Sequence, residues 1–99
     1  MKKELRQKLI EFQRARHWED YHTGPELARA LMVEAAELNR LFMWGSEPAF
    51  HDSLENLQDE LADIAIYLEY LLMRYNIDID RAVEQKIEKN AIKYPVEKD

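Results

Sequence analysis

The chain has 99 residues, 46% of them hydrophobic and 34% charged, which is typical of one soluble domain and excludes a disordered segment. The formal net charge of -6 argues against the basic surface of a nucleic-acid-binding protein, so no nucleic-acid partner is expected. The absence of cysteine excludes disulfides and thiolate metal sites. No apolar run approaches the ~20 residues of a membrane span, and the N-terminus lacks a signal core. We therefore expect a cytoplasmic protein without membrane contact.

Helix-breaking residues are scarce, with only two glycines and three prolines, and this predicts an all-α fold of long helices. The first helix is predicted over residues 3–16, where apolar residues recur at helical spacing. The next stretch breaks the pattern. A second helix is predicted over residues 26–43, with Thr23 or Gly24 as its cap and Pro25 in its first turn.

The third predicted helix begins at Asp52 or Ser53, reaches about Tyr75, and is apolar on two sides. Its apolar residues form a 3-4 repeat and a second face: Leu54, Leu57, Leu61, Ile64, Leu68, Leu71 and Tyr75, then Ile66, Tyr70 and Met73. In so short a chain, a second subunit is the natural cover for the extra face. A fourth helix is predicted over residues 79–92. We expect one domain over residues 1–99, a four-helix, bundle-like unit that oligomerises through its central helices.

One carboxylate pair lies in register with an apolar stripe. The stripe of the second helix consists of Leu27, Leu31, Leu38 and Leu41. At about 100° per residue, Glu34 falls within this stripe and Glu37 about 60° to one side. Burying an unpaired carboxylate is costly, so such a group must be protonated, ion-paired or bound to a cation.

The third helix carries a second pair, Glu60 and Asp63, on the flank of its own apolar stripe. If the two helices pack antiparallel through their stripes, the four carboxylates meet. An all-oxygen donor set selects a hard cation, Mg²⁺ or Mn²⁺, and Mg²⁺ leaves positions for water and phosphates. The cluster therefore suggests metal-assisted phosphate chemistry. Either pair alone is more often a solvated helix face, so the prediction depends on helix phase and on the presence of both pairs.

The two pairs are separated by 22 residues, and Glu-x-x-Glu followed by Glu-x-x-Asp resembles the signature of MazG-like nucleotide pyrophosphohydrolases. Three further stretches resemble the dCTP-pyrophosphatase branch of that family: residues 16–22, residues 42–44 and the Lys-x-x-x-Asn-x-x-x-Tyr-Pro ending at residues 86–95. The likeness covers about residues 8–95. The segment between Trp44 and Glu60 is shorter than is common in that branch, which leaves the base preference open.

The resemblance implies hydrolysis of a nucleoside triphosphate between the α and β phosphates, giving a monophosphate and pyrophosphate. The expected substrate is dCTP or a modified nucleotide, which would make this an enzyme of nucleotide-pool sanitation. The implied catalytic and Mg²⁺-binding residues, with Mn²⁺ as a possible substitute, are Glu34, Glu37, Glu60 and Asp63. The implied substrate-binding residues are Trp18, His22, Trp44, Tyr67, Lys86 and Asn90. A homodimer or homotetramer fits the branch.

Simpler roles exist for several of these residues. The two tryptophans could plug junctions between loops and core, Tyr67 could be an ordinary packing residue, and Lys86 a solvated cation favoured by the helix dipole. Two other functions also stay open: a non-enzymatic helical dimer acting as a binding or scaffolding module, and a nucleotide-binding regulator without turnover.

Overall fold

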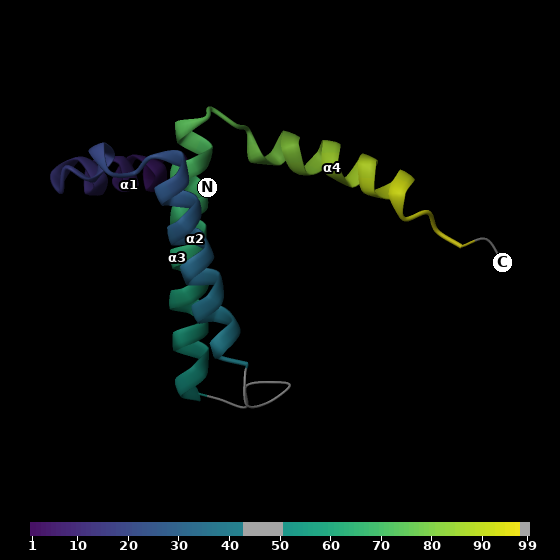
Figure 1. Cartoon of the computed structure of the whole chain (residues 1–99), viewed down its shortest axis with the longest axis horizontal. Coiled ribbons are helices and arrows are strands. Elements are labelled where there is room, and N and C mark those ends of the chain that lie inside the picture. Colours follow the sequence, from purple (N-terminus) through teal and green to yellow (C-terminus); the bar gives the residue numbers. More distant parts are fainter. Residues whose placement is uncertain (43–50, 98–99) are drawn as a thin grey trace.

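The computed structural model of the chain describes residues 1–42 and 51–97, and it consists of helices (Figure 1). In chain order the elements are α1 (Lys3–Ala15), the 3-10 turn η1 (Trp18–Asp20), α2 (Gly24–Arg40), α3 (His51–Arg74) and α4 (Ile79–Lys93). No strand occurs in these two stretches, and the prediction of an all-α fold with four α-helices is confirmed. None of the helices described is long and apolar enough to cross a membrane.

The helix ends follow local side-chain chemistry. Thr23 caps α2 as predicted, because its Oγ1 accepts a hydrogen bond from the backbone N–H of Glu26 at 3.4 Å. Asp78 caps α4 by accepting from the backbone N–H groups of Asp80 and Arg81 at 3.1 and 3.3 Å. α2 ends at Arg40, earlier than expected, while α3 begins at His51, close to its predicted start.

The antiparallel pair of α2 and α3 forms the centre of the molecule, and α1 lies across one end of it (Figure 1). Few side chains are fully buried. The buried apolar residues in the described ranges are Leu27 on α2 and Tyr70 and Leu72 on α3. The Tyr70 hydroxyl donates a hydrogen bond to the carbonyl oxygen of Leu9 at 3.1 Å, which ties α1 to α3.

An ion pair between Arg6 on α1 and Glu69 on α3 makes the second link between these helices. The Glu69 side chain is only 5% exposed, whereas that of Arg6 is 42% exposed. Because Glu69 is buried while Arg6 is partly exposed, removing Arg6 leaves a partly screened uncompensated charge, and Arg6→Met should lower the free energy of unfolding by about 2 kcal/mol. Urea denaturation followed by circular dichroism measures this loss. Arg29→Met, which breaks an exposed pair with Glu26, should cost less than about 0.5 kcal/mol. Equal effects of the two variants would contradict this assignment.

A single chain is more extended than a compact domain of its length. Its radius of gyration is 16.9 Å, against about 13 Å for a compact 100-residue domain. The main reason is α4, which leads away from the α2–α3 pair (Figure 1). The four helices therefore do not close into a compact bundle within one chain.

The predicted 3-4 repeat of α3 divides into two sets. One set, at every seventh position, is half-buried: Leu57, Ile64 and Leu71. The other set, also at every seventh position, is exposed, and we call it the exposed α3 stripe: Leu54, Leu61, Leu68 and Tyr75. A row of large apolar side chains along one face is costly to leave in water, and it marks a surface suited to association.

Candidate active site

Three carboxylates from the α2–α3 pair lie together. Glu34 comes from α2, and Glu60 and Asp63 come from successive turns of α3. One carboxylate oxygen from each lies within 4.8 Å of the other two, and all three residues are half-buried. We call this group the acidic triad. The antiparallel packing brings it together, because Glu34 lies in register with the leucines that α2 turns toward α3.

The triad is electrostatically costly when no cation is bound. The pKa of Glu34 is raised from 4.5 to about 7, first by hydrogen bonding to Glu60, then by burial, and then by the charges of Asp63, Glu60 and Glu37. Oε2 of Glu60 is buried and has no hydrogen-bond partner in the described part of the chain. A buried oxygen without a partner and a carboxyl group that resists ionisation both indicate a missing positive charge.

The donor set fits a hard divalent cation. All three side chains offer oxygen, the ligand atom that Mg²⁺ and Mn²⁺ prefer. Two oxygens bound to one Mg²⁺ at 2.0–2.1 Å can be at most about 4.2 Å apart. Oxygens at neighbouring positions on an octahedral Mg²⁺ are about 3 Å apart, so the three carboxylates, whose oxygens lie within 4.8 Å of one another, must draw together to hold such an ion. Glu34, Glu60 and Asp63 would hold it, and Glu60 Oε2 would gain its missing partner.

Glu37 lies next to the triad but outside it. Its carboxylate accepts hydrogen bonds from Arg40 Nη1 at 3.4 Å on the same helix. It also lines a polar recess of about 320 Å³, together with Arg40, Leu41, Asn56, Asp59 and Glu60. The charge of Glu37 still reaches Glu34, whose pKa it helps to raise. Glu37 thus borders the triad without belonging to it.

An apolar recess adjoins the triad on the side of α1. It has a volume of about 270 Å³, and we call it the aromatic recess; its walls are Leu9, Phe12, Trp18, Asp63, Ile66, Tyr67 and Tyr70. Asp63 belongs to both the recess and the triad. Burial raises the pKa of Tyr67 first, and the charges of Glu34 and Asp63 add to this, which places the phenol beside the triad.

A second, more open recess continues from the first. This outer recess has a volume of about 420 Å³ and shares Trp18 and Tyr67 with the aromatic recess; its other walls are Arg16, Tyr21 and His22. The His22 ring centroid lies 5.6 Å from that of Trp18 and 6.3 Å from that of Tyr67. Together the two recesses form an aromatic surface that runs from His22 to Asp63.

The other predicted site residues lie elsewhere. Lys86 and Asn90 are on α4, which leads away from the triad of its own chain (Figure 1). Neither residue lines the recesses described above. Trp44 lies outside the described residues. The structure thus gathers Trp18, His22 and Tyr67 around one surface.

Some walls of the site were not predicted from the sequence. Leu9 and Phe12 line the aromatic recess, although in the sequence they belong to the apolar stripe of the first helix. Phe12 is 45% exposed and lies edge-on to Trp18, with ring centroids 5.6 Å apart. Asp59 lines the polar recess, yet it resembles any exposed acidic residue in the sequence. Only the crossing of α1 over the helix pair shows that Phe12 faces the site.

The protein is all-α, and its acidic triad lies beside an aromatic recess. The triad suits a divalent cation and the recess suits a flat ligand, which defines the class of protein. The chain belongs to the MazG-like family, whose family model matches residues 30–99. This confirms the resemblance seen in the sequence. All of α1, the η1 turn and the first residues of α2 lie outside the matched range.

Individual relatives extend the match to nearly the whole chain. The dCTP pyrophosphatase 1 of Rattus norvegicus is 38% identical over an alignment of 99 positions. The alignment covers 94% of this chain and 58% of the relative. The Homo sapiens protein of the same name is 36% identical over 98 residues, covering 93% and 58%. The chain therefore spans less than two thirds of the length of these relatives.

A solved structure supports the fold over most of the chain. The crystal structure of a pyrophosphatase from Archaeoglobus fulgidus matches with a TM-score of 0.79 and 36% sequence identity. The match covers 94% of this chain and 91% of that one. The helical arrangement described above is therefore shared with a protein of similar length.

Proposed function

We propose that this protein is a nucleoside triphosphate pyrophosphohydrolase that requires Mg²⁺. It cleaves a (deoxy)nucleoside triphosphate between the α and β phosphates and releases a monophosphate and pyrophosphate. The observation that carries this proposal is that Asp63 belongs both to the acidic triad and to the wall of the aromatic recess. A nucleotide whose base enters the recess would bring its phosphates to the triad.

The parts of the site suit this reaction. Aromatic side chains such as Trp18 and Tyr67 stack on the face of a base, and stacking alone discriminates weakly among bases. Mg²⁺ would offset the phosphate charge and activate a water molecule. One carboxylate of the cluster would orient this water and take a proton from it. The names of the relatives support dCTP as the substrate, and a modified nucleotide is the other substrate that we propose.

A product assay tests the reaction. The purified protein is incubated with Mg²⁺ and a panel of canonical and modified triphosphates, and pyrophosphate and orthophosphate are measured separately. We expect pyrophosphate and the monophosphate in equal amounts, with the highest kcat/KM for a cytosine nucleotide. Release of single orthophosphate, or no turnover on any member of the panel, would overturn the proposal.

Protons and Mg²⁺ should compete for the triad, and thermal melting can detect the competition. In the metal-free protein, Glu34 has a pKa of about 7 in the folded state against 4.5 ordinarily. The folded state therefore binds more protons, so stability should fall as pH rises from about 4.5 through 7. Added Mg²⁺ should raise the Tm more at pH 8 than at pH 6, because ionised ligands bind it better. A Tm increment that is equal at both pH values would contradict a cation site at Glu34.

We further propose that the protein is at least a homodimer, formed through the central helices, and that it can assemble into a tetramer. The exposed α3 stripe and the extended shape of one chain support association. On α4, Val83 and Ile87 are also exposed, four residues apart on one face. A second copy would cover both surfaces and supply the compactness that one chain lacks.

Association would also explain the position of Lys86 and Asn90. α4 carries them away from the triad of its own chain, so in a dimer they would serve the partner's nucleotide. Co-expression of Glu34→Gln and Lys86→Ala chains tests this arrangement. A mixed dimer then contains one doubly substituted site and one native site, so activity should return to about a quarter of the native level. If each chain serves its own site, no mixed dimer regains a native site and activity stays at the level of the two variants.

A further inference from the structure

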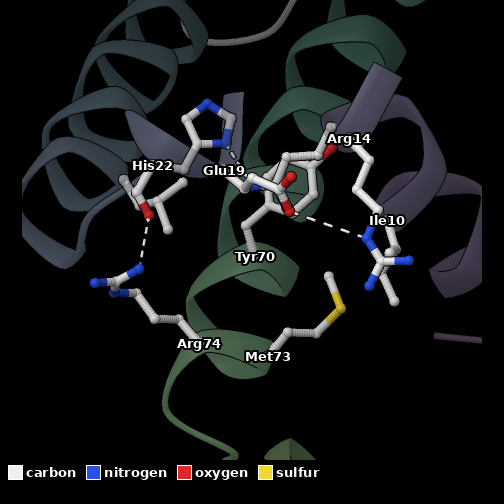
Figure 2. Close-up of a pocket in the computed structure, with 9 residues that line it drawn as sticks. Ile10, Arg14, Glu19, His22, Tyr70, Met73 and Arg74 are labelled. Atoms are coloured by element: carbon white, nitrogen blue, oxygen red, sulfur yellow. Dashed lines mark hydrogen bonds and ion pairs between the residues drawn. The ribbon is translucent and has the colours of Figure 1, made fainter. Parts of the chain in front are cut away.

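The candidate site contains a hydrogen bond between two side chains that the function proposed above does not use. Nε2 of Gln13, on α1, lies 2.7 Å from Nδ1 of His22, which follows the η1 turn. Both side chains are half-buried. Figure 2 shows the dashed bond at one ring nitrogen of His22, with the second ring nitrogen on the opposite side of the ring. The bond thus leaves that second nitrogen, Nε2, available to another partner.

The surroundings of the ring favour its neutral form. Its centroid lies 5.3 Å from that of Tyr70 and 5.6 Å from that of Trp18, and burial lowers the pKa of His22. A neutral imidazole has one nitrogen that donates and one that accepts. Because the amide N–H of Gln13 donates to Nδ1, the ring proton must be on Nε2.

We propose that Gln13 is a positioning residue that holds His22 in the Nε2–H tautomer and thereby sets the base preference of the site. His22 lines the outer recess, and in this tautomer Nε2–H is the one donor that its ring can offer to a ligand there. This donor suits a base edge that offers acceptors, such as the O2–N3 edge of cytosine. Uracil keeps the O2 acceptor but carries a hydrogen at N3, so a donor aimed at N3 would meet a donor. The inference rests on the proposed nucleotide hydrolysis and narrows its substrate class.

The tautomer can be measured without turnover. Long-range ¹H–¹⁵N correlation spectra of the labelled protein, at a pH where the ring is neutral, report which ring nitrogen carries the proton. The signals of the three histidines are assigned with His17→Asn and His51→Asn. We expect His22 to be protonated at Nε2. A proton on Nδ1 would mean that the Gln13 amide turns its oxygen to the ring, and it would overturn the inference.

Gln13→Glu should reverse the arrangement. A carboxylate only accepts, so it draws the proton of a neutral ring to Nδ1 and leaves Nε2 without a hydrogen to donate. Because the new carboxylate also raises the pKa of the ring, the kinetics are measured above that pKa, where the ring is neutral. We expect the KM for dCTP to rise about tenfold, as for the loss of one hydrogen bond to a neutral group, with a much smaller change in kcat. The preference for dCTP over dUTP in kcat/KM should shrink by a similar factor. An unchanged tautomer or an unchanged preference would overturn the proposal.

Two further variants complete the experiment. Gln7→Glu adds a carboxylate to the exposed face of the same helix and should leave both the tautomer and the preference as in the native protein. Gln13→Met, close in shape, neither donates nor accepts; it should raise the KM for dCTP and keeps the test valid if Gln13→Glu does not fold. Absence of pyrophosphate release from the native protein would overturn the proposed function. Normal turnover with the wrong tautomer would overturn this inference alone.

Discussion

Glu34→Gln is expected to lower kcat for nucleotide hydrolysis by about 10²–10⁴-fold, the usual effect of losing a positioned acid–base group. The fold should be retained, since glutamine has nearly the same shape. The metal-free variant should melt at a higher temperature than the native protein at pH 8, because the substitution removes one of three crowded negative charges. The rise in Tm that Mg²⁺ produces in the native protein should be absent from this variant. Steady-state kinetics and thermal melting on the same preparations measure both effects.

A matched substitution on the same helix provides the control. Glu26 lies in the first turn of α2 and is exposed, so Glu26→Gln should keep native turnover and the native response to Mg²⁺. The two variants together separate an enzyme from a scaffold. A purely structural helical dimer would show no Mg²⁺ effect on melting with or without Glu34. Native turnover in Glu34→Gln would remove the triad from the proposed reaction.

Leu61→Glu is expected to break the assembly of the protein into dimers or larger oligomers. Leu61 is 48% exposed in one chain and lies in the middle of the exposed α3 stripe. The substitution therefore leaves the interior of the chain intact, while a carboxylate buried between two subunits would be unpaired and costly. Light scattering after size exclusion should show the 11.9 kDa monomer in place of a multiple of this mass.

If the partner subunit contributes to the site, Leu61→Glu should lower the activity as well as the mass of the assembly. Val96→Glu is the control, because Val96 is 92% exposed and follows α4 in the non-helical end of the described chain. This variant should retain the native mass and the native turnover. A native protein that is already monomeric at micromolar concentration would contradict the proposed interface directly.

The helices themselves could be predicted because their determinants are local. Scarce glycine and proline, the spacing of leucines and the cap at Thr23 act within a few residues of each other. The same periodicity placed Glu34 among leucines, so a cluster of carboxylates could be foreseen before any helix was packed. The paired carboxylate pattern also identified the MazG-like family.

Packing decided which side chains share a space, since that depends on how distant segments cross. The antiparallel contact of α2 with α3 groups Glu34 with Glu60 and Asp63, while Glu37 lies beside them and pairs with Arg40. The crossing of α1 brings Phe12 to the recess and sets Gln13 against His22, nine residues along the chain. No periodicity within α1 carries that information. Whether an apolar residue of α3 is covered or exposed was likewise decided only by the tertiary structure, because a repeat marks a face but not its neighbour.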